Sequence, residues 1–202
     1  MKVKKAIILA GGSAKRLGPI TQVTSKHLLP IYNKPMIYYP LSTLMLAGIK
    51  NYLIITNPYY LKLYKDLLGN GKKFGIKINY LSQTKPRGLP DAFILAKEFI
   101  GNDPICLNLG DHILFGKDIT SLIKKNIENF KKTTLFAYSH KNPKDFGVIN
   151  FDKNYKPLSI QEKPNRPKSK YIVTGLYIYD NKVMELAKKL KYSKRNELEI
   201  SD

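Results

Sequence analysis

Short apolar segments alternate with amphipathic segments along the first two thirds of the chain. The apolar segments have the length of buried strands and lie at residues 5–10, 52–56, 76–81, 105–109 and 133–138. Apolar residues recur at helical spacing in the segments between them, at residues 35–47, 59–68, 91–99 and 119–130. This βαβα order predicts an α/β fold, in which helices cover both faces of a mostly parallel central sheet.

The pattern changes after Asp145. Strand-like segments at residues 146–151, 157–162 and 171–179 follow with turns between them, and then a helical segment at 182–190. No internal repeat or low-complexity linker separates this part from the first. We interpret it as a small lobe on the scaffold of the first sheet.

Size and composition are those of a soluble globular protein. The 202 residues suffice for one sizeable domain, and 43% of them are hydrophobic and 25% charged. No apolar run approaches the roughly 18 residues of a membrane span, and the apolar stretch near the N-terminus is too short for a signal peptide. The single cysteine, Cys106, cannot form an internal disulfide. We therefore predict a cytoplasmic protein with no membrane partner.

The formal net charge of +20 at pH 7 raises the alternative of a nucleic-acid binder. Lysines are, however, spread along the chain, for example at Lys62, Lys97, Lys141 and Lys189, and do not gather into one stripe. We prefer the interpretation of a solvated basic surface that steers anionic small molecules toward the protein. No nucleic acid is therefore expected as a partner.

The first apolar run ends abruptly at Gly11-Gly12, and Lys15, Arg16 and Lys26 follow it. Backbone N–H groups of glycine can approach a ligand closely because no Cβ is in the way. Such donors, together with Lys and Arg, suit a polyphosphate. The loop therefore predicts a site for a nucleoside triphosphate, although a short Gly-Gly turn after a strand is more often only a turn.

Asp111 directly follows the apolar run at 105–109. Ligands of open parallel sheets bind at the carboxyl ends of the strands, so Asp111, the Gly11-Gly12 loop and the loop after residue 81 are expected around one crevice. A carboxylate there suits Mg²⁺ held by one carboxylate and by substrate phosphates. We prefer this to the alternative that Asp111 only caps a helix or a turn.

Two polar segments supply further candidates. Gln83 and Gly88 follow the strand predicted at 76–81, and an amide with a glycine backbone matches the imide edge of a pyrimidine; the alternative is an ordinary polar loop. Glu162 and Lys163 close another predicted strand. They either hold sugar hydroxyls and a sugar phosphate or form an exposed ion pair of little energetic weight.

Segments with a family resemblance extend from one end of the chain to the other. They are Leu9-Ala-Gly-Gly-Ser13, Lys34-Pro-Met-Ile-Tyr-Tyr-Pro-Leu41, Leu109-Gly-Asp111, Phe146-Gly-Val148, Glu162-Lys-Pro164, Val173-Thr-Gly-Leu-Tyr177 and Glu197-Leu-Glu-Ile200. The block that begins at Lys34 is the most specific of them. On these residues the chain resembles the bacterial glucose-1-phosphate thymidylyltransferases, a branch of the sugar-phosphate nucleotidyltransferase family.

The resemblance implies a Rossmann-like nucleotidyltransferase fold in one domain, with a nucleotide-binding part at about residues 1–112 and a sugar-binding part at about 113–202. It implies the transfer of dTMP from dTTP to glucose 1-phosphate, which yields dTDP-glucose and pyrophosphate. It also implies Mg²⁺ as the cofactor and a homo-oligomer, a tetramer in the family, as the assembly.

The resemblance also implies roles for residues of this sequence. The catalytic residues would be Arg16, Lys26 and Lys163. The nucleotide would be held by Gly11, Gly12, Ser13, Gln83, Gly88 and Asp111, of which Asp111 would also bind Mg²⁺. The hexose would be held by Gly147, Glu162, Val173 and Tyr177.

Some residues depart from the family pattern. Ala14-Lys15 replaces Gly-Thr, which strains the phosphate loop if position 14 needs a positive φ. His112 replaces an Asn after the metal aspartate, Asp91 replaces a Gln, and Gln161 replaces the first of two glutamates.

Family members continue past residue 202, and their second metal-binding aspartate lies in that part. We therefore expect these 202 residues to bind nucleotide but to turn over poorly. Two alternatives stay open: a uridylyltransferase of the same family, since thymine and uracil differ by one methyl group, and a nucleotide-sugar-binding or regulatory module without full catalytic activity.

Overall fold

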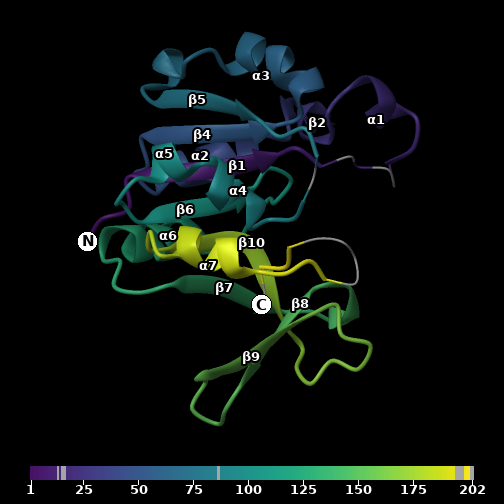
Figure 1. Cartoon of the computed structure of the whole chain (residues 1–202), viewed down its shortest axis with the longest axis vertical. Helices are drawn as coiled ribbons and strands as arrows, with labels where there is room; N and C mark the ends of the chain where they lie inside the picture. The colour runs from purple at the N-terminus through teal and green to yellow at the C-terminus, as the bar shows by residue number, and fades with distance from the viewer. Residues whose placement is uncertain (13, 15–16, 86, 194–197, 201–202) are drawn as a thin grey trace.

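The structure is a computed structural model that describes residues 1–12, 14, 17–85, 87–193 and 198–200. Within these residues, eight strands form one sheet in the order β5-β4-β1-β6-β10-β8-β9, and β7 also pairs with β10 (Figure 1). The strands are β1 (Lys5–Ala10), β4 (Asn51–Thr56), β5 (Lys77–Ser82), β6 (Ile105–Leu109), β7 (Thr134–Ser139), β8 (Gly147–Phe151), β9 (Pro157–Glu162) and β10 (Tyr171–Tyr179). A small hairpin joins β2 (Pro30–Ile31) to β3 (Lys34–Pro35).

Helices cover both faces of this sheet. The residues that pack on one face come from α2 (Tyr38–Leu46), α3 (Leu61–Leu68) and α6 (Ile119–Glu128). Those on the other face come from α4 (Asp91–Leu95), α5 (Lys97–Ile100) and α7 (Val183–Lys189). The short helix α1 (Ile20–Val23) lies beyond the end of β1 (Figure 1). The predicted α/β fold class is confirmed.

The sheet has a parallel half and an antiparallel half. Strands β5, β4, β1 and β6 pair in parallel, and a helix crosses over between successive strands in the chain. From β6 onward the pairing is antiparallel, because β10 runs against β6, β7 and β8. The hairpin of β8 and β9 extends this half and forms the arm at the bottom of Figure 1.

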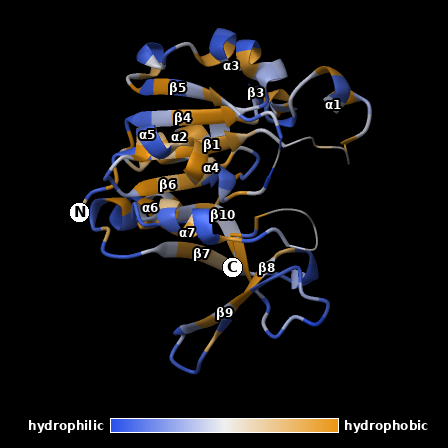
Figure 2. Ribbon diagram, viewed as in Figure 1, coloured by the Kyte–Doolittle hydropathy of each residue, from blue (hydrophilic) through white to orange (hydrophobic). Residues whose placement is uncertain are grey.

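Alternating residues of the central strands supply two separate cores. In β1, Ile8 faces the layer of α2, α3 and α6, whereas Ile7 faces the layer of α4, α5 and α7. Strand β4 repeats the pattern with Ile54 and Leu53. The central strands are therefore almost continuously apolar in Figure 2, which is typical of strands buried on both faces.

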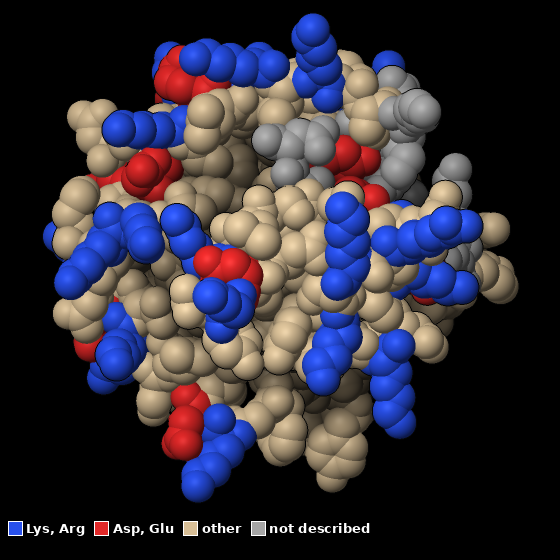
Figure 3. All heavy atoms as spheres, turned by 90° about the horizontal axis from the view of Figure 1, so that it is seen from below, with Lys and Arg blue, Asp and Glu red and all other residues tan. Residues whose placement is uncertain are grey.

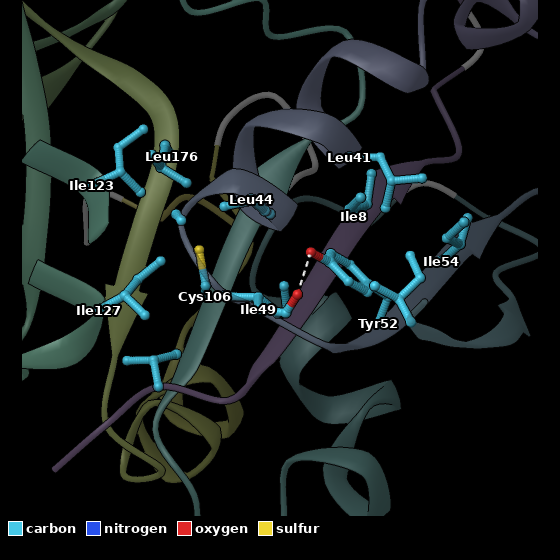
Figure 4. Close-up of a cluster of buried hydrophobic side chains, with 14 of the residues drawn as sticks. Ile8, Leu41, Leu44, Ile49, Tyr52, Ile54, Cys106, Ile123, Ile127 and Leu176 are labelled. Carbon is cyan, nitrogen blue, oxygen red and sulfur yellow. Dashed lines mark hydrogen bonds between the residues drawn. The ribbon is translucent and has the colours of Figure 1, made fainter. Parts of the chain in front are cut away.

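The first of these cores is drawn in Figure 4, where Ile8 lies between Leu41 of α2 and Tyr52 of β4. The Tyr52 hydroxyl is buried, and it donates a hydrogen bond of 3.0 Å to the carbonyl oxygen of Ile49. A buried hydroxyl without a partner is destabilising, so this bond allows a tyrosine in an otherwise apolar layer.

Two predicted helices differ in detail from the structure. The helix predicted over 91–99 is divided into α4 and α5, because Ala96 at φ −86° and ψ 12° ends the first and begins the second. The helix predicted from residue 35 begins at Tyr38, since Lys34 and Pro35 pair in the β2–β3 hairpin. The remaining predicted elements begin and end within a few residues of the observed ones.

Candidate functional site

One cavity of about 440 Å³ lies where the segments after β1, β5, β6 and β9 meet. The predicted site residues on its wall are Gly11, Gly12, Gln83, Gly88, Asp111, Glu162 and Lys163. Parallel strands place their carboxyl ends at one edge of the sheet, and this is why residues so far apart in the sequence share one cavity. The structure therefore brings together the residues that the sequence places around one crevice.

A second cavity of about 300 Å³ adjoins the first, and the two share Leu89, Leu109, Asp111, Glu162 and Ile200 on their walls. The residues assigned to the hexose all line it: Gly147, Glu162, Val173 and Tyr177. They come from β8, β9 and β10, which belong to the antiparallel half of the sheet. The parallel half thus supplies one side of the site, and the antiparallel half supplies the other.

Lys26 is not on the wall of the first cavity, but it forms an ion pair with Asp111, which is. The Lys26 Nζ donates to Asp111 Oδ2 at 2.7 Å, and both side chains are partly buried, with 30% and 34% of their surface exposed. Burial works to raise the pKa of Asp111, but the hydrogen bond and charge of Lys26 hold that pKa below its usual value. Asp111 is therefore a carboxylate at neutral pH, available to a cation that displaces Lys26.

Ser13 and Arg16, assigned to the triphosphate, lie outside the described residues, as does Lys15. Ala14 between them is described, and its φ is +46°. An L-residue in this region is disfavoured by about 1–2 kcal/mol. The strain expected from an alanine at this position is therefore present. Lys163, at φ +42°, is a second strained residue of the site.

His27 is a residue of the cavity wall that sequence reasoning did not assign to the site. It is buried, its Nδ1 lies 3.2 Å from the Ser25 hydroxyl, and that hydroxyl lies 2.7 Å from the Tyr64 hydroxyl. Burial lowers the pKa of His27 to about 4, so the ring is neutral at physiological pH. Its position next to Lys26, a residue assigned to the site, is the signal in the sequence that points to it.

His112 links the two halves of the sheet beside the second cavity. Its Nδ1 accepts a hydrogen bond of 3.1 Å from the backbone N–H of Gly175 in β10. Burial lowers the pKa of His112, which keeps the ring neutral and able to accept this bond. The histidine at this position therefore fixes β6 against β10 at the boundary between the two cavities.

Gly88 meets the last described segment of the chain. Leu198 forms an isolated parallel bridge with it, and the Leu198 N–H donates to the carbonyl of Arg87 at 2.8 Å. Gly88 has φ +101°, and a Cβ there would overlap the backbone of Leu198. Leu198, Glu199 and Ile200 also line the first cavity, so this segment closes the site beside Gly88.

The basic surface is distributed rather than concentrated. Figure 3 shows Lys and Arg side chains over much of one face, with uncharged surface between them. No helix of the described residues is long and apolar enough to cross a membrane.

The parallel sheet and the glycine loop that meets Asp111 in one cavity define a nucleotide-binding α/β protein. The model of the nucleotidyl transferase family matches residues 5–202, and the chain belongs to that family. It is 57% identical to the glucose-1-phosphate thymidylyltransferase of Neisseria meningitidis and 48% identical to that of Xanthomonas campestris. The alignments cover 98% and 100% of this chain, and 69% and 68% of those relatives. The resemblance identified from the motifs is confirmed.

Solved structures agree with this assignment. A Bacillus anthracis protein assigned as a glucose-1-phosphate thymidylyltransferase, solved with a sucrose, superimposes with a TM-score of 0.89 at 42% identity. That match covers 98% of this chain and 80% of the other. A UDP-glucose pyrophosphorylase complexed with UDP-glucose superimposes with a TM-score of 0.87 at 26% identity, over 99% of this chain and 84% of that one.

Replacing Gly88 by alanine is expected to lower the free energy of unfolding by at least about 1–2 kcal/mol, because φ is positive and the added Cβ meets Leu198. Urea unfolding measures the change. Gly116→Ala is the matched control, since nothing lies within 4 Å of a Cβ at that position. Equal stability of the two variants would contradict the close contact with Leu198.

The neutral His27 predicts a pH dependence of stability. The native pKa of His27, about 4, lies below the usual histidine value of 6.5. The contribution of the neutral ring to the free energy of unfolding is therefore complete above pH 6.5 and declines as the pH falls toward 4. Between pH 7.5 and 5.0 the wild-type free energy of unfolding should fall by about 2 kcal/mol more than that of His27→Gln. Urea unfolding of both proteins at both pH values measures this difference. An equal fall in the free energy of unfolding of the two proteins would show that His27 does not contribute.

Proposed function

We propose that this chain transfers dTMP from dTTP to glucose 1-phosphate and releases pyrophosphate. The observation that carries the proposal is the pair of adjoining cavities that share Asp111 and Glu162. One has the glycine loop and Gln83 on its wall, and the other has the residues assigned to a hexose. Two substrates that must meet at one phosphorus atom need such a shared boundary.

The reaction needs little from the protein beyond position and charge. An oxygen of the sugar phosphate attacks the α-phosphorus of dTTP, a new P–O bond forms, and the bond to the β-phosphate breaks as pyrophosphate leaves. Lys163 lies on the wall of the first cavity, and Lys26 pairs with Asp111 on that wall, so the charges of both lysines offset those of the phosphates. Ser13 and Arg16 are proposed to hold the triphosphate beside the Gly11-Gly12 backbone.

The residues present fit a magnesium ion. Asp111 offers a hard oxygen ligand, and its lowered pKa keeps the carboxylate charged. In the described residues it does not stand within a group of three or more His, Cys, Asp or Glu that could hold a metal, so phosphate oxygens would supply further ligands. Mg²⁺ bound there would neutralise charge on the triphosphate.

A uridylyltransferase is the second candidate function. The observation that favours it is the structural likeness to a UDP-glucose pyrophosphorylase. A hydrogen bond between Gln83 and the base serves uracil as well as thymine, so selection between the two depends on the space around one methyl group. The higher identity to thymidylyltransferases favours dTTP.

We further propose a cytoplasmic homo-oligomer in which residues 1–112 bind the nucleotide and 113–202 the sugar. The side chain of Phe115 is 100% exposed in the loop between these parts, which suits contact with another copy. A nucleotide-binding module without full activity remains the alternative, and the strained Ala14 is the observation behind it.

Thermal unfolding in the presence of dTTP, UTP, ATP and GTP, with and without Mg²⁺, tests the nucleotide. A ligand that binds only the native state stabilises it by about 2.7 kcal/mol at 100 times its Kd, so dTTP should raise the melting temperature most. Pyrophosphate release with glucose 1-phosphate then tests the transfer. A larger shift with ATP or GTP would overturn the proposal, and a dTTP shift without release would favour the binding module.

Replacing Asp111 by asparagine tests the magnesium site. The Kd for dTTP with Mg²⁺ should rise at least about tenfold, a change of about 1.4 kcal/mol, while the Kd in EDTA should change much less. Asp66→Asn is the matched control, because this exposed carboxylate lies on α3 and pairs with Lys62. An unchanged effect of Mg²⁺ in Asp111→Asn would exclude Asp111 as a ligand.

A further inference from the structure

The side chain of Gln83 is held by a buried carboxylate. Gln83 follows β5, and its Nε2 donates a hydrogen bond of 2.6 Å to Oδ2 of Asp91. Asp91 lies in the first turn of α4 and is only 7% exposed. The backbone N–H of Gln83 also donates to the carbonyl of Thr56 at 2.8 Å, so both the backbone and the side-chain amide of Gln83 are held by hydrogen bonds.

The chemistry of the pair determines which way the Gln83 amide points. A carboxylate only accepts hydrogen bonds, whereas an amide has an accepting oxygen and a donating NH₂ group. The NH₂ group must therefore face Asp91, and the oxygen must face away from it. That oxygen lies 3.6 Å from the place that a Cβ on Gly11 would occupy, and both residues line the first cavity.

We propose that Asp91 is a positioning residue that adds to base selectivity in this chain by presenting Gln83 to the cavity as an acceptor. This inference rests on the proposed function, in which Gln83 contacts the base. Thymine and uracil offer a ring N–H at N3, which donates to such an acceptor. Cytosine offers a lone pair at N3, and two acceptors that face each other are unfavourable. Among pyrimidine nucleotides, Asp91 therefore disfavours cytosine without contacting it.

An amide in place of the Asp91 carboxylate, such as the Gln of the family pattern, removes the contribution of Asp91 and leaves base selection to the other groups around the base. Asparagine or glutamine at position 91 accepts from the Gln83 NH₂ or donates to the Gln83 oxygen, so either orientation of Gln83 is satisfied. The flipped orientation presents an NH₂ group to the cavity and matches cytosine. Glutamate at position 91 keeps an acceptor-only partner and is the conservative variant.

The test measures Kd for dTTP and for dCTP by calorimetry, with Mg²⁺ and without any sugar phosphate. In the wild-type chain dTTP should bind more tightly than dCTP. In Asp91→Asn the ratio of the Kd for dCTP to the Kd for dTTP should fall about five- to tenfold, which is the effect of one hydrogen bond. In Asp91→Glu this ratio should stay closer to that of the wild-type chain. Glu98→Gln is the matched control, since this carboxylate is exposed on α5 and should leave the ratio unchanged.

The outcomes separate this inference from the proposed function. A dTTP preference in Asp91→Asn that equals that of the wild-type chain overturns the role of Asp91 and leaves the function intact. A wild-type chain without any dTTP preference overturns the function, and the inference with it. A general loss of affinity for both nucleotides at an unchanged ratio identifies a merely structural role, and this also overturns the inference.

Two further measurements keep the test decisive if Asp91→Asn does not fold. Asp91→Gln carries the same expectation. In the wild-type chain, NMR should show the Gln83 Cδ resonance moving when dTTP binds, because Oε1 gains a donor, while the NH₂ signals move less. The reverse pattern would show that the NH₂ group faces the base and would overturn the proposal.

Discussion

The parallel pairing of β1 with β4 on one side and β6 on the other fixes where chemistry takes place in this protein. It brings the ends of β1 and β6 to the same edge, so the Gly11-Gly12 loop and Asp111 line one cavity. The antiparallel β10, paired with β6, then places the β8–β9 hairpin across from them. The site is a consequence of this single change from parallel to antiparallel pairing.

The site also contains strained backbone and partly buried charges, which are locally unfavourable. Ala14 and Lys163 adopt positive φ, and Lys26 brings a charge against a partly buried Asp111. Beneath them, His27 is kept neutral against Ser25. Strained backbone and opposed charges are stabilised by the apolar layers on both faces of the sheet. Binding of a polyphosphate would give these charges a second partner.

Most of the fold could be predicted from apolar periodicity, because each central strand is buried on both faces and reads as a continuous apolar run. The runs at 5–10, 105–109 and 171–179 match the observed strands in both bounds. The helix predicted over 91–99 was wrong as a single element. Periodicity there fits one helix, whereas the backbone angles of Ala96 divide it into α4 and α5.

The sequence by itself determined the strand ends that carry Gly11, Gln83 and Asp111, since the order of residues along the chain fixes which side chains come after each apolar run. Only the tertiary structure decided which groups those side chains contact. The pair of Lys26 and Asp111 spans 85 residues, and the bridge between Gly88 and Leu198 joins segments still farther apart. Such contacts depend on the packing of the whole sheet, and no local pattern encodes the direction of one amide.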